Sequence, residues 1–185
     1  MRIFVRASGK KQRGAAAVEF ALIAMFFFAV LFGIVEFGRG LYVWNSIQEV
    51  TRYVAREAVV CWRSDWNSMR DARGMMGLSS LPAAPELTST NITIEPLRRA
   101  DKVVLTGSNL PGTVDANASN CMLPDVAGTP PNCIGYVRVT VNASFTPLIG
   151  TLLWFPLPAS GIQLPRSTVD MPAESLGFMR AGCAA

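Results

Sequence analysis

Histidine is absent from the 185 residues of this chain. Its absence removes the usual general base at neutral pH, the Ser-His and Cys-His nucleophile pairs, and the most common protein metal ligand. The sequence also lacks a Cys-x-x-C pair and a glycine-rich phosphate loop of the G-x-x-x-x-G-K-S/T type. Its acidic residues are scattered without a spacing that indicates a catalytic pair. We therefore expect no enzymatic activity, no cofactor and no metal site.

Positive charge is scarce outside the first 13 residues. That segment holds Arg2, Arg6, Lys10, Lys11 and Arg13 and no acidic residue. The rest of the chain has 12 basic and 13 acidic residues, although the net charge of the whole is +4. A nucleic-acid-binding domain carries its positive charge on its folded part. We therefore expect no nucleic-acid partner.

Charge is almost missing from the stretch that follows. The 21 residues Ala15–Val35 contain one charged side chain, Glu19. As an α-helix they would be about 31 Å long, close to the roughly 30 Å hydrocarbon core of a bilayer. The run is longer than the apolar region of a secretory signal peptide and no A-x-A cleavage pattern follows it, so we expect a retained anchor. Because basic residues beside a first membrane helix stay in the cytoplasm, we expect the N-terminus inside and the rest outside.

Proline is absent from residues 1–81. Beyond the apolar run, apolar residues continue at helical spacing, which predicts one nearly continuous helix from about Ala15 to about Trp62, with an amphipathic outer half. We expect the chain's own domain to cover this apolar stripe, the alternative being a partner helix. The stripe consists of Val43, Ile47, Val50, Val54, Ala58 and Cys61.

The remaining residues, about 150, suffice for one modest domain. In Tyr136–Ala143 the valines at 137, 139 and 141 alternate with polar residues, which is typical of a strand with one buried face. Gly161–Met171 is expected to form a strand pair, or one strand interrupted at Pro165 at the edge of the sheet. The predicted fold class is α+β, with the long helix packed against a small antiparallel sheet. The other predicted elements are strands at Thr90–Glu95 and Lys102–Thr106 and a short helix around Ser68–Met76 in the mostly loop-like residues 63–89.

Two further stretches have no regular pattern. Residues 107–134 are rich in Gly, Pro, Asn and Ser and are predicted to form a long loop. Phe145–Leu157 is strongly apolar but too short to cross a membrane. It is either a buried connection between strands or a loop that docks on a membrane surface or a partner, with Trp154 at the interface.

Four cysteines in an oxidising compartment predict disulfides, and four allow three pairings. We prefer Cys121–Cys133, which closes a short loop and would pin residues 107–134. Cys61–Cys183 would then tie the end of the long helix to the C-terminus. The alternative is that some of these cysteines are free thiols.

Glu19 needs an explanation, because an acid at the centre of a membrane helix costs roughly 2.5–3.5 kcal/mol and less near an end. One interpretation is that its side chain reaches back to the cytoplasmic interface. The other is that it meets a positive group inside the membrane. Cleavage after Gly14 would leave a free ammonium group on Ala15, and Glu19 could pair with the ammonium of a neighbouring subunit. Such a pair would specify register more than stability.

These residues resemble a known processing site. Gly14–Phe20 (GAAAVEF) is similar to the G-x-x-x-x-E-Y/F site of Flp-type prepilins, a branch of the type IV pilins. The wider stretch RGAAAVEFALIAMFFFAVLFGIVEFGR resembles the TadE-like pseudopilins of the Tad (tight adherence) pilus system. Ala55–Ala58 extends the resemblance along the helix, and residues 136–172 follow it loosely. Residues 63–135 lie outside it.

The resemblance implies roles for individual residues. A prepilin peptidase would cleave after Gly14, Ala15 would become the mature N-terminus, and Glu19 with Phe20 would serve assembly. The implied organisation is a cleaved basic leader at 1–14, a transmembrane helix at 15–36, its amphipathic extension at 37–62 and an extracytoplasmic α+β domain at 63–185.

The resemblance also implies a function. Members are minor pilins that prime or cap the filament, and hence serve adhesion and biofilm formation; major Flp pilins are far shorter than this chain. Implied partners are other pilins and pseudopilins, the prepilin peptidase, the inner-membrane assembly platform and the lipid bilayer. The implied location is the bacterial inner membrane, with a periplasmic domain or incorporation into the extracellular pilus. The size fits a TadE-like or TadF-like component better than a TadG-like one. The alternative is an unprocessed single-pass membrane protein whose periplasmic domain binds a partner in a secretion system.

Overall fold

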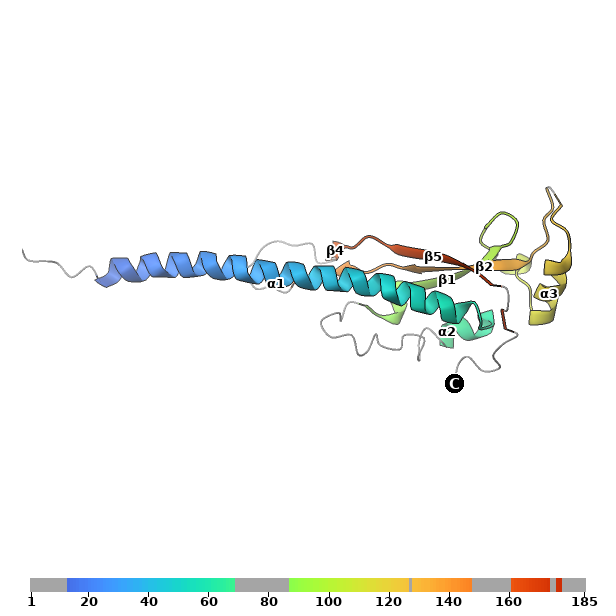
Figure 1. Cartoon of the computed structure of the whole chain (residues 1–185), viewed down its shortest axis with the longest axis horizontal. Coiled ribbons are helices and arrows are strands. Elements are labelled where there is room, and N and C mark those ends of the chain that lie inside the picture. Colours follow the sequence, from blue (N-terminus) through green and yellow to red (C-terminus); the bar gives the residue numbers. More distant parts are fainter. Residues whose placement is uncertain (1–12, 69–86, 127, 148–160, 174–175, 178–185) are drawn as a thin grey trace, which may run out of the picture.

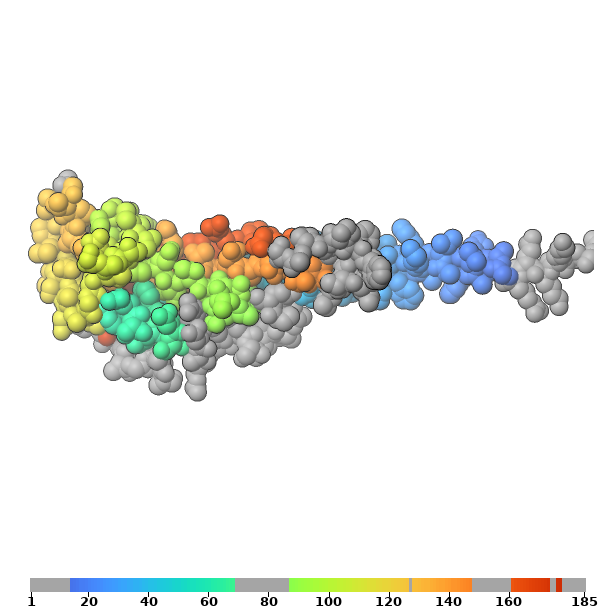
Figure 2. Space-filling view, turned by 180° about the vertical axis from the view of Figure 1, so that it is seen from behind, coloured from blue at the N-terminus to red at the C-terminus, as the bar shows by residue number. Residues whose placement is uncertain are grey.

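The computed structural model describes residues 13–68, 87–126, 128–147, 161–173 and 176–177. These residues form an α+β structure in which one long helix, α1 (Arg13–Ala58, 46 residues), packs over part of its length against a small antiparallel sheet. The N-terminal half of α1 stands clear of the domain as a single rod (Figures 1 and 2). The predicted helix is confirmed, with its observed end at Ala58 four residues before Trp62.

The end of α1 is closed by a tryptophan from the following turn. After Ala58 the chain passes through the 3-10 helix η1 (Arg63–Asp65) into the short helix α2 (Trp66–Ser68). The buried Trp66 indole Nε1 donates to the carbonyl oxygens of Ala58 and Cys61, at 3.1 and 3.2 Å. Because the last carbonyls of a helix have no partner within it, this contact satisfies acceptors that would otherwise be buried and unpaired.

The main sheet has three antiparallel strands in the order β1-β2-β5. These are β1 (Ile92–Arg98), β2 (Ile134–Val141) and β5 (Ser167–Pro172). A second, two-stranded sheet joins β3 (Ser144–Phe145) to β4 (Ile162–Gln163). The chain therefore changes sheets at Pro165, and the prediction of a strand interrupted there at the sheet edge is confirmed.

The core lies between the apolar stripe of α1 and the inner face of the sheet. Val137, Val139 and Val141 of β2 are fully buried, as their alternation with polar residues predicts. Five of the six predicted stripe residues are also buried, and Val50 is partly buried against them. The chain's own domain covers the stripe, as predicted. The buried stripe residues are Val43, Ile47, Val54, Ala58 and Cys61.

Two sequence predictions in the domain are wrong. Lys102–Thr106 is not a full strand: after a turn at Lys102, which has a φ of 56°, it folds back on the end of β1 and forms a single bridge, between Leu97 and Val104. Residues 107–134 are not all loop. They contain the 3-10 helix η4 (Gly107–Asn109) and the helix α3 (Val114–Met122).

Helix α3 begins with an N-terminal cap, although the Asn- and Ser-rich composition of this segment predicted a loop. The Thr113 side chain accepts a hydrogen bond from the Ala116 backbone N–H at 3.1 Å, and Asp115 lies in the first turn. Both features favour a helix start. The predicted helix around Ser68–Met76 and most of the apolar stretch up to Leu157 lie outside the described residues, as does Trp154.

Candidate functional site

The exposed half of α1 is the first candidate site. Gly14, Ala15, Glu19 and Phe20 lie in its first two turns, and all four are exposed. A Cβ atom built on Gly14 would meet no atom within 4 Å. The predicted processing motif therefore lies at the start of α1, on the half of the helix that the domain does not cover (Figure 2).

The same part of the helix carries a continuous apolar surface. Its mean hydropathy reaches 2.6, none of the most apolar window is buried, and its length is sufficient to cross a membrane. An apolar surface of this extent requires a nonpolar environment, which a bilayer or packed helices supply. These are the properties of an N-terminal membrane anchor. Its large exposed side chains are Val18, Phe20, Leu22, Ile23, Met25, Phe26, Phe27, Phe28, Val30, Leu31, Phe32, Ile34, Val35 and Phe37.

An ion pair lies where α1 enters the domain. Arg39 Nη2 is 2.8 Å from Glu36 Oε1, and both side chains are largely buried. Arg39 also donates to the Thr146 carbonyl oxygen, and its guanidinium carbon lies 4.2 Å from the centre of the Phe145 ring. The Phe145 ring in turn lies over Gly40, where a Cβ would meet it at 3.6 Å. These contacts join the helix to β3.

Sequence reasoning missed this junction. The i,i+3 spacing of Glu36 and Arg39 indicates a helix-surface pair, but it carries no information about Phe145, which comes 106 residues after Arg39. Only the fold brings the aromatic ring and the guanidinium together.

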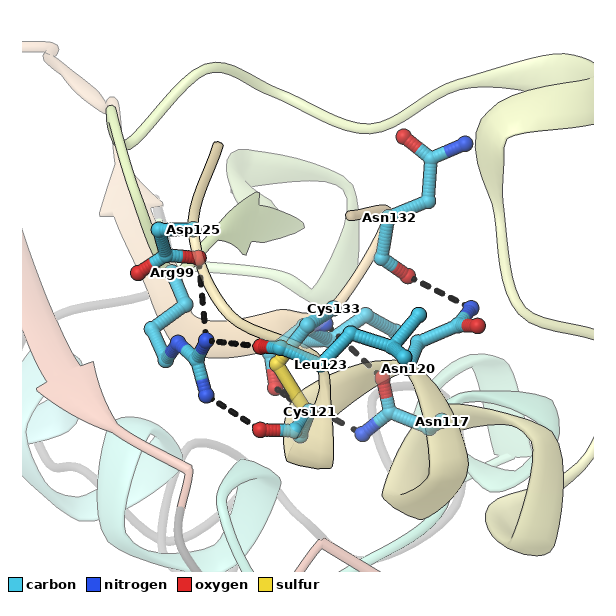
Figure 3. The surroundings of a disulfide bond; sticks show 9 residues. Arg99, Asn117, Asn120, Cys121, Leu123, Asp125, Asn132 and Cys133 are labelled. Atoms are coloured by element: carbon cyan, nitrogen blue, oxygen red, sulfur yellow. Dashed lines mark hydrogen bonds and ion pairs between the residues drawn. A yellow bond between two sulfur atoms is a disulfide. The ribbon is translucent and has the colours of Figure 1, made fainter. Parts of the chain in front are cut away.

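The domain end farthest from the exposed helix is held by a disulfide. Cys121 of α3 is bonded to Cys133, as predicted, with Cα atoms 4.9 Å apart. Asn117 lies beside this bond, where its Oδ1 accepts from the Ile134 backbone N–H at 2.8 Å (Figure 3). These contacts fasten α3 to the start of β2.

Arg99 fastens the chain that leaves α3. Its guanidinium donates to the carbonyl oxygens of Cys121 and Leu123 and pairs with Asp125 at 2.9 Å (Figure 3). The turn that follows presents Met122, Leu123 and Val126 to solvent. These contacts of Arg99 were not predicted, because nothing in the sequence spacing of Arg99 and Asp125 indicates that they are close.

The remaining predicted cysteines are only partly described. Cys61 is buried and disulfide-bonded. Its predicted partner, Cys183, lies outside the described residues. No cysteine is a free thiol among those that the structure describes.

The outer face of the main sheet carries a second ion pair. Arg138 of β2 donates to both carboxylate oxygens of Asp170 of β5, at 2.7 and 2.9 Å. The hydrogen bonds from Arg138 lower the pKa of Asp170 and outweigh the opposite effect of desolvation. The same contact raises the pKa of Arg138. Among the residues described, no group of three or more Cys, Asp and Glu side chains is placed to hold a metal ion.

Together, an exposed apolar helix with a processing-type motif at its start and an attached α+β domain define a class of membrane-anchored proteins. The family model described as TadE-like protein matches residues 14–56, which is nearly the whole of α1. Over this segment the chain is similar to the TadE-like family of the Tad pilus system, which supports the resemblance seen in the sequence. No curated protein and no solved structure matches the chain.

Proposed function

We propose that this protein is a minor pseudopilin of a Tad/Flp-type pilus, cleaved after Gly14 and assembled through its mature N-terminal helix. The observation that carries the proposal is that the TadE-like match begins at Gly14 and covers nearly the whole of α1, including the half that the domain leaves exposed. A cleavage site and an assembly surface both require access by another protein. The exposed first turns of α1 supply it.

Cleavage would change the charge of the helix end. It removes the five basic residues of the leader and creates an ammonium group on Ala15. Glu19 follows four residues later, about 6 Å along the helix axis and close to one full turn. The mature helix would thus begin with a positive group and carry the one carboxylate of its apolar run, Glu19, a turn further on.

This arrangement specifies how neighbouring helices align. Within one helix the ammonium and the carboxylate are fixed by the geometry of the turn. Between helices packed side by side, Glu19 meets a neighbour's Ala15 ammonium only at one axial offset. In a low-dielectric environment a misaligned, unpaired charge is costly, so the pair acts mainly on register. Phe20, beside it on the exposed surface, would contribute apolar contact to the same assembly.

The domain supports a minor subunit over a shaft subunit. An α+β domain attached along the second half of α1 is unsuited to a thin shaft of helices and suits a subunit that primes or caps the filament. We place the leader in the cytoplasm and the domain in the periplasm, on the charge asymmetry around the span. The partners are then other pilins and pseudopilins, the prepilin peptidase and the inner-membrane assembly platform, and the process served is adhesion.

Intact-mass measurement of the membrane-extracted protein tests the proposal. In cells with a working pilus system the mature chain should start at Ala15, and Gly14→Lys should retain the leader. Because the surroundings of Gly14 are open, the lysine is not excluded by packing. Gly112→Lys is the matched control, since this domain glycine is equally open, and it should leave cleavage intact.

A leader still attached in cells that assemble pili would overturn the proposal. That result would favour an unprocessed single-pass protein whose domain binds a partner in a secretion system.

A further inference from the structure

We propose that α1 and β4 carry an interfacial collar that binds the lipid headgroup layer on the domain side of the membrane. The collar consists of Leu41, Tyr42 and Trp44 of α1 and Ile162 of β4, all exposed. It follows the Glu36–Arg39 ion pair along α1, where the helix enters the domain. The proposal rests on α1 spanning the membrane and adds how deeply the helix sits and where the domain touches the lipid.

The aromatic side chains are of the kind that interfaces select. Tyr42 and Trp44 are 38% and 39% exposed, whereas Val43 between them is fully buried in the core. Successive helix residues are rotated by about 100°, so the two rings flank the domain contact on opposite sides of α1. Tyrosine and tryptophan gather at membrane–water boundaries because their rings are apolar and their O–H and N–H groups reach water.

The charged side chains next to the collar are already paired with each other. Arg39 is paired with Glu36, donates to the Thr146 carbonyl oxygen and lies against the Phe145 ring. After Arg39 the helix has no charged residue before Glu49, and β3 and β4 have none. An ion pair that is hydrogen-bonded and covered can approach the lipid without exposing an isolated charge. In Figure 1, β4 lies at the end of the domain from which the exposed helix emerges.

The length of α1 distinguishes between two possible depths of the helix in the membrane. If the hydrocarbon core covered Ala15–Val35, Trp44 would lie about 13 Å beyond it, outside a headgroup layer that is about 5–8 Å thick on each side. Glu19 and Trp44, in contrast, are separated by about 37 Å of helix, which lies between the roughly 30 Å core and the 40–45 Å full thickness. Both residues then occupy headgroup layers on opposite sides, and the paired, covered Glu36 and Arg39 lie just inside the hydrocarbon boundary. On assembly, the Glu19 side chain would move from the cytoplasmic headgroup layer to the Ala15 ammonium group of a neighbouring subunit.

Depth-dependent fluorescence quenching tests this placement. The full chain is reconstituted into vesicles whose phospholipids carry bromine either near the headgroup or near the acyl-chain end. In a variant with Trp62→Phe, Trp66→Phe and Trp154→Phe, Trp44 should lose most of its emission to the shallow label and little to the deep one. Because Trp66 is buried and this variant could fold poorly, Trp44→Phe in the otherwise unchanged chain provides a second measurement. It should lower the fraction quenched by the shallow label relative to the unchanged chain.

A tryptophan introduced into the membrane-spanning part of α1 tests whether the helix crosses the membrane, separately from whether the collar lies in the headgroup layer. Phe27→Trp, added to a background lacking the four native tryptophans, should be quenched most by the deep label. Deep quenching at position 27 with no quenching of Trp44 would overturn the collar and leave the span intact. Trp44 quenched as deeply as position 27 would also overturn it. If neither position is quenched, the membrane anchor itself is wrong.

Discussion

Arg138 and Asp170 face each other across β2 and β5 through two hydrogen bonds, at 2.7 and 2.9 Å. They are opposite one another in the antiparallel register, so the pair links the central strand to the edge strand. Because Arg138 stabilises the ionised carboxylate, the pKa of Asp170 in the folded domain lies below its ordinary value of 3.8. The contact is partly exposed, which limits its contribution to about 0.2–1 kcal/mol.

Acid should therefore weaken this contact. A carboxyl whose pKa is depressed by folding adds stability above its unfolded pKa, and that stability is lost as the pH falls through the folded value. We expect the urea midpoint of the detergent-solubilised protein to fall below about pH 4. Asp170→Asn should lower the midpoint at pH 7 and flatten the acid dependence. An unchanged pH profile in Asp170→Asn would assign the acid effect to other carboxyl groups.

Ile47→Ala tests whether the stripe of α1 is part of the domain core. Ile47 is fully buried, so its truncation should reduce the free energy of unfolding by about 2–5 kcal/mol. Ile34→Ala is the matched control in the same helix, because Ile34 is 69% exposed and makes no part of the core. Urea unfolding followed by near-ultraviolet circular dichroism measures both. Equal effects of the two substitutions would mean that the stripe does not stabilise the domain.

Gly135→Ala probes the close approach of β2 to the β1 end. A Cβ at position 135 would lie 2.5 Å from the Cβ and 2.7 Å from the Cα of Arg99. Since the Cα belongs to the backbone, relief requires a strand shift, and we expect destabilisation of about 1–3 kcal/mol. Gly112→Ala adds the same methyl group at a glycine with open surroundings and should change stability little. Thermal unfolding distinguishes them, and two identical melting curves would refute the close approach.

Glu19→Ala separates membrane insertion from assembly. Removing the carboxylate lowers the cost of membrane insertion, so the amount of inserted protein should not fall. Loss of the pairing with a neighbour's Ala15 should reduce co-purification with other pilins after crosslinking. Glu49→Ala, an exposed acid further along the same helix, is the control and should retain it. If Glu19→Ala co-purified fully with other pilins, the alternative interpretation would hold, in which the Glu19 side chain only reaches back to the cytoplasmic interface.

Helical and strand periodicity proved the most predictable features. The spacing of Val43, Ile47 and Val54 predicted a buried stripe, and the alternation of the β2 valines predicted a buried sheet face; both are observed. Periodicity is a property of neighbouring residues, so it can be recognised without knowing what the element packs against. The preferred pair Cys121–Cys133 was also local, being only 12 residues apart.

Predictions failed where turns, caps and individual side-chain contacts, rather than periodicity, decide the local structure. Lys102–Thr106 has the apolar composition of a strand, but the turn at Lys102 and a single bridge to Leu97 limit its pairing. Helix α3 was predicted as loop from its Asn and Ser content. Its cap at Thr113 and its attachment through Asn117 and the disulfide compensate for weak helix propensity.

By itself, the sequence determined that an apolar helix with one carboxylate continues into an amphipathic helix that needs a sheet to cover it. This follows from residue order, because the lengths and faces of helices and strands depend on spacing alone. Only the tertiary structure decided where the exposed helix ends. Arg39 meets Phe145 and Thr146 because the domain folds β3 back onto α1, and that contact marks where the domain begins to cover one face of the helix.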